Sequence, residues 1–314
     1  MQALPTPDQP LKIGTRGSPL ALAQAHEARD RLMVAHGLPQ AAFAIVVIKT
    51  TGDRVQDRPL KELGGKGLFT REIEEALLAG AIDIAVHSMK DMPTLQPGGL
   101  VIDCYLPRED VRDGFVGSVP GLAVLPEGAL VGTSSLRRRA QVLHRRPDLT
   151  VTEFRGTVQT RLRKLADGVA HCTFLAMAGL NRLGLAQVVT APVAVEEMLP
   201  AIAQGAIGVE RRLGDDRAAM LLGAIHHGET GLRLAAERAF LAALDGSCDT
   251  PIAGLAVLGD GGLWLRGEIL HPDGTACYAG DLRGAADNGA ALGKALAQEL
   301  LGRAPVGFFD WRKG

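Results

Sequence analysis

Hydrophobic positions follow two different periods along the first half of the chain, and this predicts alternating strands and helices. Short apolar runs at residues 11–14, 43–48 and 82–86 are typical of buried strands. Residues 18–37 and 70–78 instead carry apolar side chains at helical spacing, and Ser18 followed by Pro19 is a helix start signal. Such alternation predicts α/β units built on a parallel or mixed sheet.

The second half of the chain repeats part of this layout. Residues 131–135 (Val-Gly-Thr-Ser-Ser) resemble residues 13–18 (Ile-Gly-Thr-Arg-Gly-Ser), and GVAHCTFLAM at 168–177 lines up with GAIDIAVHSM at 80–89. Two segments that recur in the same order favour a duplicated α/β architecture over coincidence. Two similar lobes are expected to form a cleft, where ligand sites are common.

A third region begins near Gly228. An amphipathic helix is predicted over 232–244, strands over 252–258, 262–270 and 275–281, and a last helix over 290–301. The strands are separated by turns such as Pro272-Asp273-Gly274. This pattern predicts a small α+β domain.

Composition indicates an ordinary globular protein of more than one domain. The chain has 314 residues, 46% hydrophobic and 22% charged, with a formal net charge of −1. A nucleic-acid binder would show a basic excess with stacking aromatics, but aromatics make up only 4%. Neither an apolar signal segment nor a membrane-spanning run is recognised, so we expect a cytoplasmic protein without nucleic-acid or membrane partners.

The cysteines carry no metal-binding spacing. Cys104, Cys172, Cys248 and Cys277 form no CxxC pair, so no metal site is expected and reduced thiols are favoured over disulfides. Cys248 stands in a Gly/Ser/Pro-rich segment, LDGSCDTP, and is predicted to be accessible and nucleophilic, although a lone loop cysteine can also be incidental. The other three lie in apolar segments and are expected to be inert.

Basic residues concentrate between Arg137 and Lys164, where nine Lys or Arg residues accompany two acids. Ser134 and Ser135 precede this stretch at a predicted helix N-terminus, which favours anions. Arg137, Arg138, Arg155 and Arg161 lie near turns, and for them anion binding and a solvated surface both remain open. Arg145, Arg146 and Arg163 are expected on a solvated helix face.

Two further segments suggest a ligand site. GGKG at 64–67 is not a nucleotide-binding P-loop, because Leu60 and Gly67 replace its required glycine and hydroxyl residues, which leaves a Lys66-bearing loop able to close over a ligand. HSMKD at 87–91 directly follows a predicted strand, where sites occur in α/β sheets. Lys90 and Asp91 there form either a structural ion pair or part of a site in which Lys90 binds pyridoxal phosphate.

Together these segments resemble the porphobilinogen deaminase (hydroxymethylbilane synthase) family along almost the whole chain. The matching segments, in family order, are GTRGSPLALAQA, GGKGLFTREIE, AVHSMKD, GTSSLRR, RGTVQTRL, AGLNRLGL, QGAIGVE and LDGSCDTPIAG. The chain departs from the family pattern at Gly17 and Ala23, where Gln and Trp are common, at Glu62, and at Thr157, where Asn is usual. None of these differences removes a chemical group that the implied mechanism needs.

The resemblance implies a transferase of heme and porphyrin biosynthesis. It would hold a dipyrromethane cofactor through a thioether to Cys248, and join four porphobilinogen molecules head to tail with loss of ammonia into linear hydroxymethylbilane. It would act as a monomer and pass the product to a separate cyclising synthase. The alternatives are a non-catalytic two-lobed anion-binding protein and a pyridoxal-phosphate enzyme that uses Lys90.

The resemblance also assigns roles to residues. Asp91 would be catalytic, stabilising positive charge as the amine departs. Lys66 would lie on the mobile loop. The residues implied to bind substrate or cofactor are Arg16, Ser18, Lys66, Ser88, Lys90, Thr133, Ser134, Ser135, Arg137, Arg138, Arg155, Arg161, Arg182 and Gln204.

The implied fold is α/β, with two lobes like those of periplasmic binding proteins, each with a mixed sheet, and a small α+β C-terminal domain. The implied domains are residues 1–106 with 205–223, residues 107–204, and residues 228–314, the last of which carries the cofactor cysteine.

Overall fold

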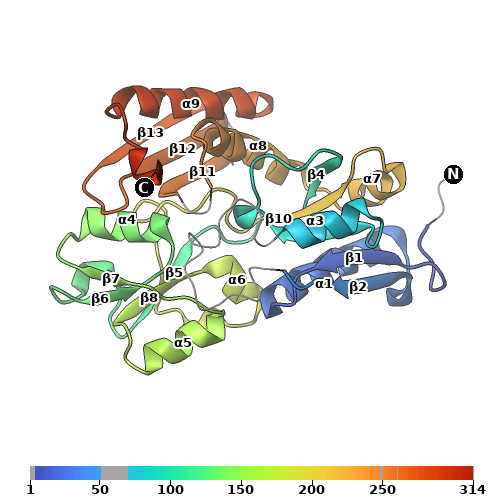
Figure 1. Cartoon of the computed structure of the whole chain (residues 1–314), viewed down its shortest axis with the longest axis horizontal. Coiled ribbons are helices and arrows are strands. Elements are labelled where there is room, and N and C mark those ends of the chain that lie inside the picture. Colours follow the sequence, from blue (N-terminus) through green and yellow to red (C-terminus); the bar gives the residue numbers. More distant parts are fainter. Residues whose placement is uncertain (1–3, 51–69, 248–249, 260, 314) are drawn as a thin grey trace. The chain divides into compact units, whose positions relative to one another are not determined.

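The computed structural model describes residues 4–50, 70–247, 250–259 and 261–313. The chain divides into two compact units. The first comprises Met1–Glu109 and Ala206–Gly231, and the second comprises Asp110–Gly205 and Leu232–Gly314. Figure 1 shows the helices and strands of the chain.

The first unit is built on a mixed sheet of five described strands in the order β2-β1-β3-β10-β4. β1 is parallel to β2 and β3, whereas β10 is antiparallel to β3 and β4. These strands are β1 (Leu11–Thr15), β2 (Phe43–Val47), β3 (Ile84–Ser88), β4 (Leu100–Tyr105) and β10 (Ile207–Arg212). The accompanying helices are α1 (Pro19–His36), α3 (Arg71–Leu78) and α7 (Asp216–Gly223).

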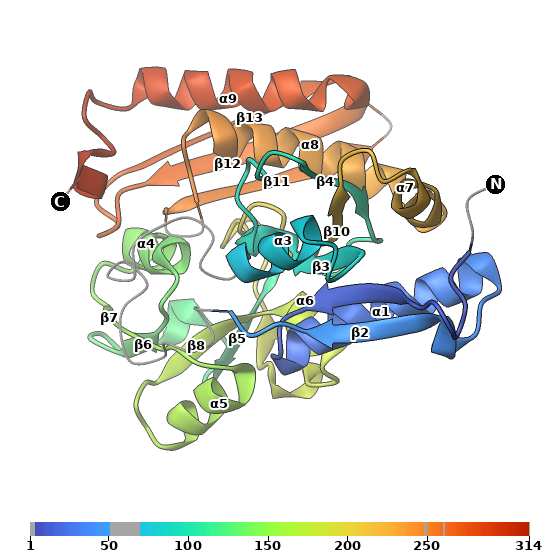
Figure 2. The ribbon, with the colours of Figure 1, turned by 45° about the vertical axis from the view of Figure 1, so that its right-hand side comes forward.

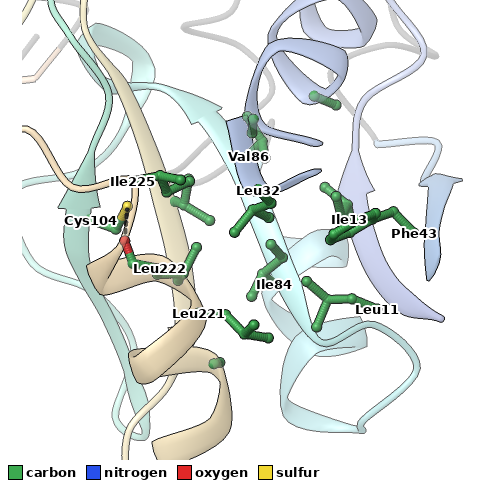
Figure 3. Close-up of a cluster of buried hydrophobic side chains, with 14 of the residues drawn as sticks. Leu11, Ile13, Leu32, Phe43, Ile84, Val86, Cys104, Leu221, Leu222 and Ile225 are labelled. Atoms are coloured by element: carbon green, nitrogen blue, oxygen red, sulfur yellow. Dashed lines mark hydrogen bonds between the residues drawn. The ribbon is translucent and has the colours of Figure 1, made fainter. Parts of the chain in front are cut away.

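Local signals explain where α1 begins and ends. Ser18 caps it by accepting a hydrogen bond from the backbone N–H of Ala21, with Pro19 at its first position. Gly37 ends it in the left-handed conformation, with φ of 63°. Leu32 of α1 packs with Ile13 of β1 and Val86 of β3 in the buried core of this unit (Figure 3). This core fixes the strand ends from which the candidate site is built.

The second unit contains an equivalent sheet among its described residues, in the order β7-β6-β8-β5-β9. β6 is parallel to β7 and β8, and β5 is antiparallel to β8 and β9. These strands are β5 (Asp113–Gly117), β6 (Leu130–Gly132), β7 (Thr150–Thr152), β8 (Cys172–Ala176) and β9 (Ala191–Pro192). The helices here are α4 (Leu136–Arg145), α5 (Val158–Ala166) and α6 (Met177–Arg182).

The two sheets have the same strand directions, and matching glycines support the duplication predicted from the sequence. Gly14 near the end of β1 lies against Ile82, and Gly132 at the end of β6 lies against the ring of Phe154, so a Cβ atom at either position would clash. Gly80 and Gly168 precede β3 and β8 with φ of 71° and 72°. The mixed α/β lobes expected from the sequence are therefore confirmed.

The remainder of the second unit is an α+β layer. Antiparallel strands β11 (Ile252–Gly259), β12 (Gly262–Leu270) and β13 (Cys277–Gly284) form its sheet. Phe240 of α8 (Gly228–Ala243) and Leu296 of α9 (Gly289–Arg303) both approach Gly267 of β12, so the two helices cover one face of this sheet (Figure 2). The small C-terminal α+β domain expected from the sequence is therefore present.

Two strand boundaries differ from the prediction for identifiable reasons. The third strand begins at Ile84 rather than at residue 82, because the carboxylate and the backbone N–H of Asp83 both bond to the backbone of Lys12. The last strand begins at Cys277 rather than at residue 275, because Asp273 accepts hydrogen bonds from the backbone N–H and the hydroxyl of Thr275. Thr275 therefore still belongs to the turn. Within the described ranges, none of the helices has the length and apolar character needed to cross a membrane.

Candidate active site

The first unit contains a pocket at the ends of two parallel strands. β1 ends at Thr15 and β3 at Ser88, and parallel pairing of Ile13 with Ile84 brings these ends to the same edge of the sheet. The residues that line the pocket are Arg16, Ser18, Leu20, Ala21, Gln24, Thr70, Val86, His87, Ser88, Asp91 and Met92. Four predicted site residues, Arg16, Ser18, Ser88 and Asp91, are therefore brought together.

Asp91 is the exposed acidic group of this pocket. It lies in a short 3₁₀ helix, Met89–Asp91, that directly follows β3, and its side chain is exposed whereas Met89 is buried. Lys90 belongs to the same short helix but is not among the residues that line the pocket. The Asp91 carboxylate and the Arg16 cation line the same pocket, and the carboxylate there can stabilise positive charge that develops in a bound molecule.

Two polar pairs that the sequence did not predict hold the end of β3. Buried Gln24 of α1 donates from Nε2 to Ser88 Oγ at 2.8 Å, and the Ser88 hydroxyl donates to Gln24 Oε1 at 3.0 Å. His87 Nε2 lies 3.0 Å from Glu210 Oε2 of β10, with both side chains buried. A polar residue among the apolar positions Ala21, Ala25 and Ala28 was the available signal for Gln24.

Glu74 of α3 is a further buried acid in the first unit. Burial raises the pKa of its carboxyl above the ordinary value, and the negative charge of Glu210 raises this pKa further, whereas a hydrogen bond with Thr70 lowers it. Thr70 lines the pocket.

In the second unit, the start of α4 uses the three predicted hydroxyl residues in local hydrogen bonds. Ser135 accepts from the backbone N–H of Arg138 at 3.4 Å as the N-cap, and Thr133 Oγ1 accepts from the N–H of Ser135 at 3.2 Å. Ser134 Oγ accepts from the N–H of Phe154 at 3.0 Å. These bonds fix the loop between β6 and α4.

Arg137 and Arg138 have a shared internal partner that the sequence did not predict. Both are buried, and their Nη2 atoms lie 2.7 Å from the two carboxylate oxygens of Asp113. Each also donates through Nη1 to a backbone carbonyl, Arg137 to Leu199 at 2.9 Å and Arg138 to Phe174 at 2.8 Å. Burial alone would raise the pKa of Asp113, but the charges of Arg137 and Arg138 outweigh it and hold this pKa far below its ordinary value.

Three other predicted residues lie near chain turns in this unit. Arg161 donates through Nε to the carbonyl of Gly156 at 3.0 Å, and Arg155 precedes that glycine. Arg182, the last residue of α6, donates to the carbonyl of Gly205 at 3.2 and 3.3 Å. These three arginines are half-buried rather than enclosed.

Gln204 is buried and connects two segments of the second unit. Its Nε2 donates to the carbonyl of Val111 at 2.8 Å and to Asp113 Oδ1 at 2.9 Å. The structure therefore gathers Arg137, Arg138 and Gln204 around Asp113. Lys66 and Cys248 lie outside the described residues.

The chemistry of this cluster suits a ligand with carboxylate groups. Asp113 supplies one negative charge against two buried guanidiniums, so the cluster of these three side chains keeps a net positive charge. The Nε atoms of Arg137 and Arg138 are buried without a hydrogen-bond partner. Buried cations require compensating charge, and a carboxylate-bearing group such as dipyrromethane fits this donor set.

The fold and the site define a class of protein with two similar α/β units and buried arginines suited to a small molecule that carries carboxylates. Residues 11–220 match the family described as "Porphobilinogen deaminase, dipyromethane cofactor binding domain", and residues 232–302 match "Porphobilinogen deaminase, C-terminal domain". The chain belongs to the porphobilinogen deaminase family.

Relatives agree over the full length. The chain is 68% identical to porphobilinogen deaminase of Paracoccus denitrificans (strain Pd 1222), with 99% of this chain and 100% of that protein covered. It is 53% identical to the chloroplastic porphobilinogen deaminase of Pisum sativum, with 96% and 83% covered. These findings confirm the family, the enzyme class and the dipyrromethane cofactor expected from the sequence. They do not favour the anion-binding or pyridoxal-phosphate alternatives.

Two solved structures share part of the fold at low sequence identity. The VFT2 domain of Bordetella pertussis BvgS is 17% identical, with a TM-score of 0.37 over 68% of this chain and 85% of that chain. A TRAP periplasmic solute binding protein from Pseudomonas putida F1, with bound D-glucuronate, is 13% identical, with a TM-score of 0.39 over 74% and 81%.

Proposed function

We propose that this chain joins four porphobilinogen molecules head to tail into linear hydroxymethylbilane, with Asp91 as the catalytic carboxylate. The observation that carries this proposal is the exposed Asp91 side chain in a pocket with Arg16 and Ser18. In each addition the C–N bond of an aminomethyl group breaks, ammonia leaves, and a C–C bond forms to a pyrrole α-carbon that loses its proton. Water adds when the product is released.

The residues at the start of α4 are suited to hold the cofactor. Arg137 and Arg138 would bind its carboxylate arms, and Thr133, Ser134 and Ser135 would shape the adjoining loop. Cys248 would form the thioether. When bound, the cofactor supplies the pyrrole carbon to which the first substrate is joined.

The pocket of the first unit would bind and orient the incoming substrate. Arg16 and Ser18 would hold a carboxylate arm, supported by the N-terminus of α1. Asp91 would accept hydrogen bonds from pyrrole N–H groups and stabilise the positive charge that develops as ammonia departs. Ser88, fixed by Gln24, would support the same wall, and Lys90 would add a cation beside it.

Elongation requires further cations, since every added unit brings two carboxylate arms. Arg155, Arg161 and Arg182 are half-buried basic residues that could bind these arms. Lys66 would contribute from the segment 64–67, and Gln204 would keep its place beside Asp113.

The domain boundaries and the cellular setting belong to the same proposal. The domains would be residues 1–106 with 205–223, residues 107–204, and residues 228–314.

The free thiols of Cys104, Cys172 and Cys277 suit a reducing compartment such as the cytoplasm. The enzyme would act as a monomer and release its linear product to a separate cyclising synthase, because ring closure is a different reaction. Porphobilinogen would be its small-molecule partner, without nucleic acid or membrane.

The test compares Cys248→Ser with the matched variant Cys277→Ser. Intact mass should show the dipyrromethane adduct on the wild-type protein and on Cys277→Ser, but not on Cys248→Ser. Only the first two should consume porphobilinogen and release ammonia. A wild-type mass equal to that of the sequence, or an adduct on folded Cys248→Ser, would contradict the proposal.

A further inference from the structure

We propose that Asp113 is a positioning residue of this enzyme, which orients the guanidinium groups of Arg137 and Arg138 for the carboxylates of the bound pyrrole chain. The inference rests on the proposed function, in which these two arginines bind such carboxylates. Asp113 was not singled out by the sequence, and it is the first residue of β5.

The geometry joins both arginines to one carboxylate. Asp113 is 0% exposed, and its two oxygens each accept from a different guanidinium at 2.7 Å. Arg137 and Arg138 are neighbours at the start of α4, so their side chains leave the helix in different directions. A single bridging carboxylate between them therefore fixes the direction of both planar groups.

The charges explain why this carboxylate is needed. Without Asp113, two buried guanidiniums would lie close together with only backbone carbonyls as acceptors, and their repulsion in a region of low dielectric would push them apart. With Asp113, one positive charge of the cluster is balanced and the other stays available for a ligand anion. Glu268 also attracts Arg137, but burial raises the pKa of its carboxyl and so disfavours its charged form.

Gln204 extends the network to the segments that join the two units. It donates to Asp113 and to the carbonyl of Val111, next to the point at which the chain enters the second unit. Gly205, which follows Gln204, ends the first segment of the second unit, Asp110–Gly205. Its carbonyl accepts hydrogen bonds from Arg182. Asp113 is thus fixed by its place in β5 and by hydrogen bonds from Gln204 and both arginines.

The experiment uses the full-length holoenzyme and a double-mutant cycle of Asp113→Asn, Arg138→Gln and the double variant. The matched control is Asp148→Asn, which breaks a similar Arg–Asp pair, Arg146–Asp148, beyond the C-terminal end of the same helix. Each protein is examined for cofactor adduct by intact mass, for kcat and KM with porphobilinogen, and for the covalent species that carry one, two or three added pyrroles.

We expect Asp113→Asn to lower kcat/KM by about ten- to a hundredfold, because hydrogen bonds between charged groups are lost. Its KM and its distribution of covalent species should change, and its effect should not add to that of Arg138→Gln, since both act through the same guanidinium. Asp148→Asn should retain wild-type KM and distribution.

A merely structural role would reduce the amount of folded protein but leave KM and the distribution of species unchanged. That result, or full additivity with Arg138→Gln, would overturn the inference. If Asp113→Asn does not fold, the double variant restores the wild-type charge of the cluster and is compared with Arg138→Gln in the same assays. If the arginine variants themselves behave as wild type, the proposed function of these arginines fails instead.

Discussion

His87 of β3 and Glu210 of β10 form a buried pair, with Nε2 and Oε2 separated by 3.0 Å and side chains 5% and 0% exposed. The pair joins antiparallel neighbours of the first sheet directly before Ser88, at the pocket edge. Glu210 has no other described partner for its Oε1 atom. The pair therefore supports the wall of the pocket through one buried interaction.

Replacing Glu210 by Gln should lower the free energy of unfolding by about 1–3 kcal/mol, because it removes a buried charged partner of His87. Urea unfolding followed by circular dichroism measures this change. Glu299→Gln is the control, since it disturbs only an exposed pair with Arg303 and should change the free energy by less than about 0.5 kcal/mol. Equal unfolding midpoints for wild type and Glu210→Gln would show that the pair does not stabilise the sheet.

Asp91→Asn should lower kcat by roughly 10²–10³, which is the usual effect of removing one preorganised electrostatic group. The side chain is exposed, so the free energy of unfolding should stay within about 0.5 kcal/mol of the wild-type value. Asp91→Glu keeps the charge and should retain more activity than Asn. Initial rates of porphobilinogen consumption test this, with the exposed Asp30→Asn as control; near wild-type turnover by Asp91→Asn would rule out the catalytic role.

Because of Asp113, the free energy of unfolding should decrease as the pH falls into the acid range. Burial opposes its ionisation, but Arg137 and Arg138 hold its pKa in the folded protein far below the unfolded value. The unfolded chain therefore binds the proton more tightly, so the stabilisation is complete above about pH 4–5 and is lost as the pH falls towards the folded pKa. Urea unfolding from about pH 7 to about pH 3 should show the difference between wild type and Asp113→Asn shrinking with acid. A constant difference over this range would contradict the assigned pKa direction.

Local signals in the sequence predicted much of the fold. The Ser18-Pro19 start and the Gly37 end of α1 depend on backbone geometry within a few residues, so they could be recognised without the structure. The equivalence of the two lobes was also visible in the recurrence of Gly-Thr and hydroxyl residues after a strand.

Tertiary partners could not be predicted in the same way. Gln24 and Ser88 are 64 residues apart, and Arg138 and Asp113 are 25 apart. Nothing near Asp113 in the sequence distinguishes it from an acid at the edge of a strand. Arg146 was expected on a solvated face, but it donates to the carbonyls of Leu122, Ala123 and Leu125 and to Asp148. Such pairings depend on which strands become neighbours.

The raised thiol pKa values agree with the expectation that three cysteines are inert. Burial raises the pKa of Cys104 and of Cys172 to about 12, and that of Cys277 to about 11. At neutral pH these thiols are therefore protonated and poor nucleophiles. The sequence predicted this correctly because all three lie in apolar or strand segments.

The arginines assigned to elongation should differ from one another in the step that they support. Arg155, Arg161 and Arg182 lie at different turns of the second unit, so each would meet a different carboxylate of the growing chain. Each Arg→Gln change should weaken particular additions by roughly one to two decades, since a hydrogen bond to a charged group is lost. Arg163→Gln is the matched control, because Arg163 is exposed on the same helix as Arg161.

Mass spectrometry after mixing each variant with porphobilinogen gives the measurement. Each of the three variants should accumulate its own covalent species with one, two or three added pyrroles, whereas Arg163→Gln should give the wild-type distribution. Far-UV circular dichroism shows whether each variant is folded, so a lost step can be separated from a lost fold. If all four variants give the wild-type distribution, these arginines are surface charges. The loss of a guanidinium that binds a carboxylate of the growing chain would change the distribution of covalent species.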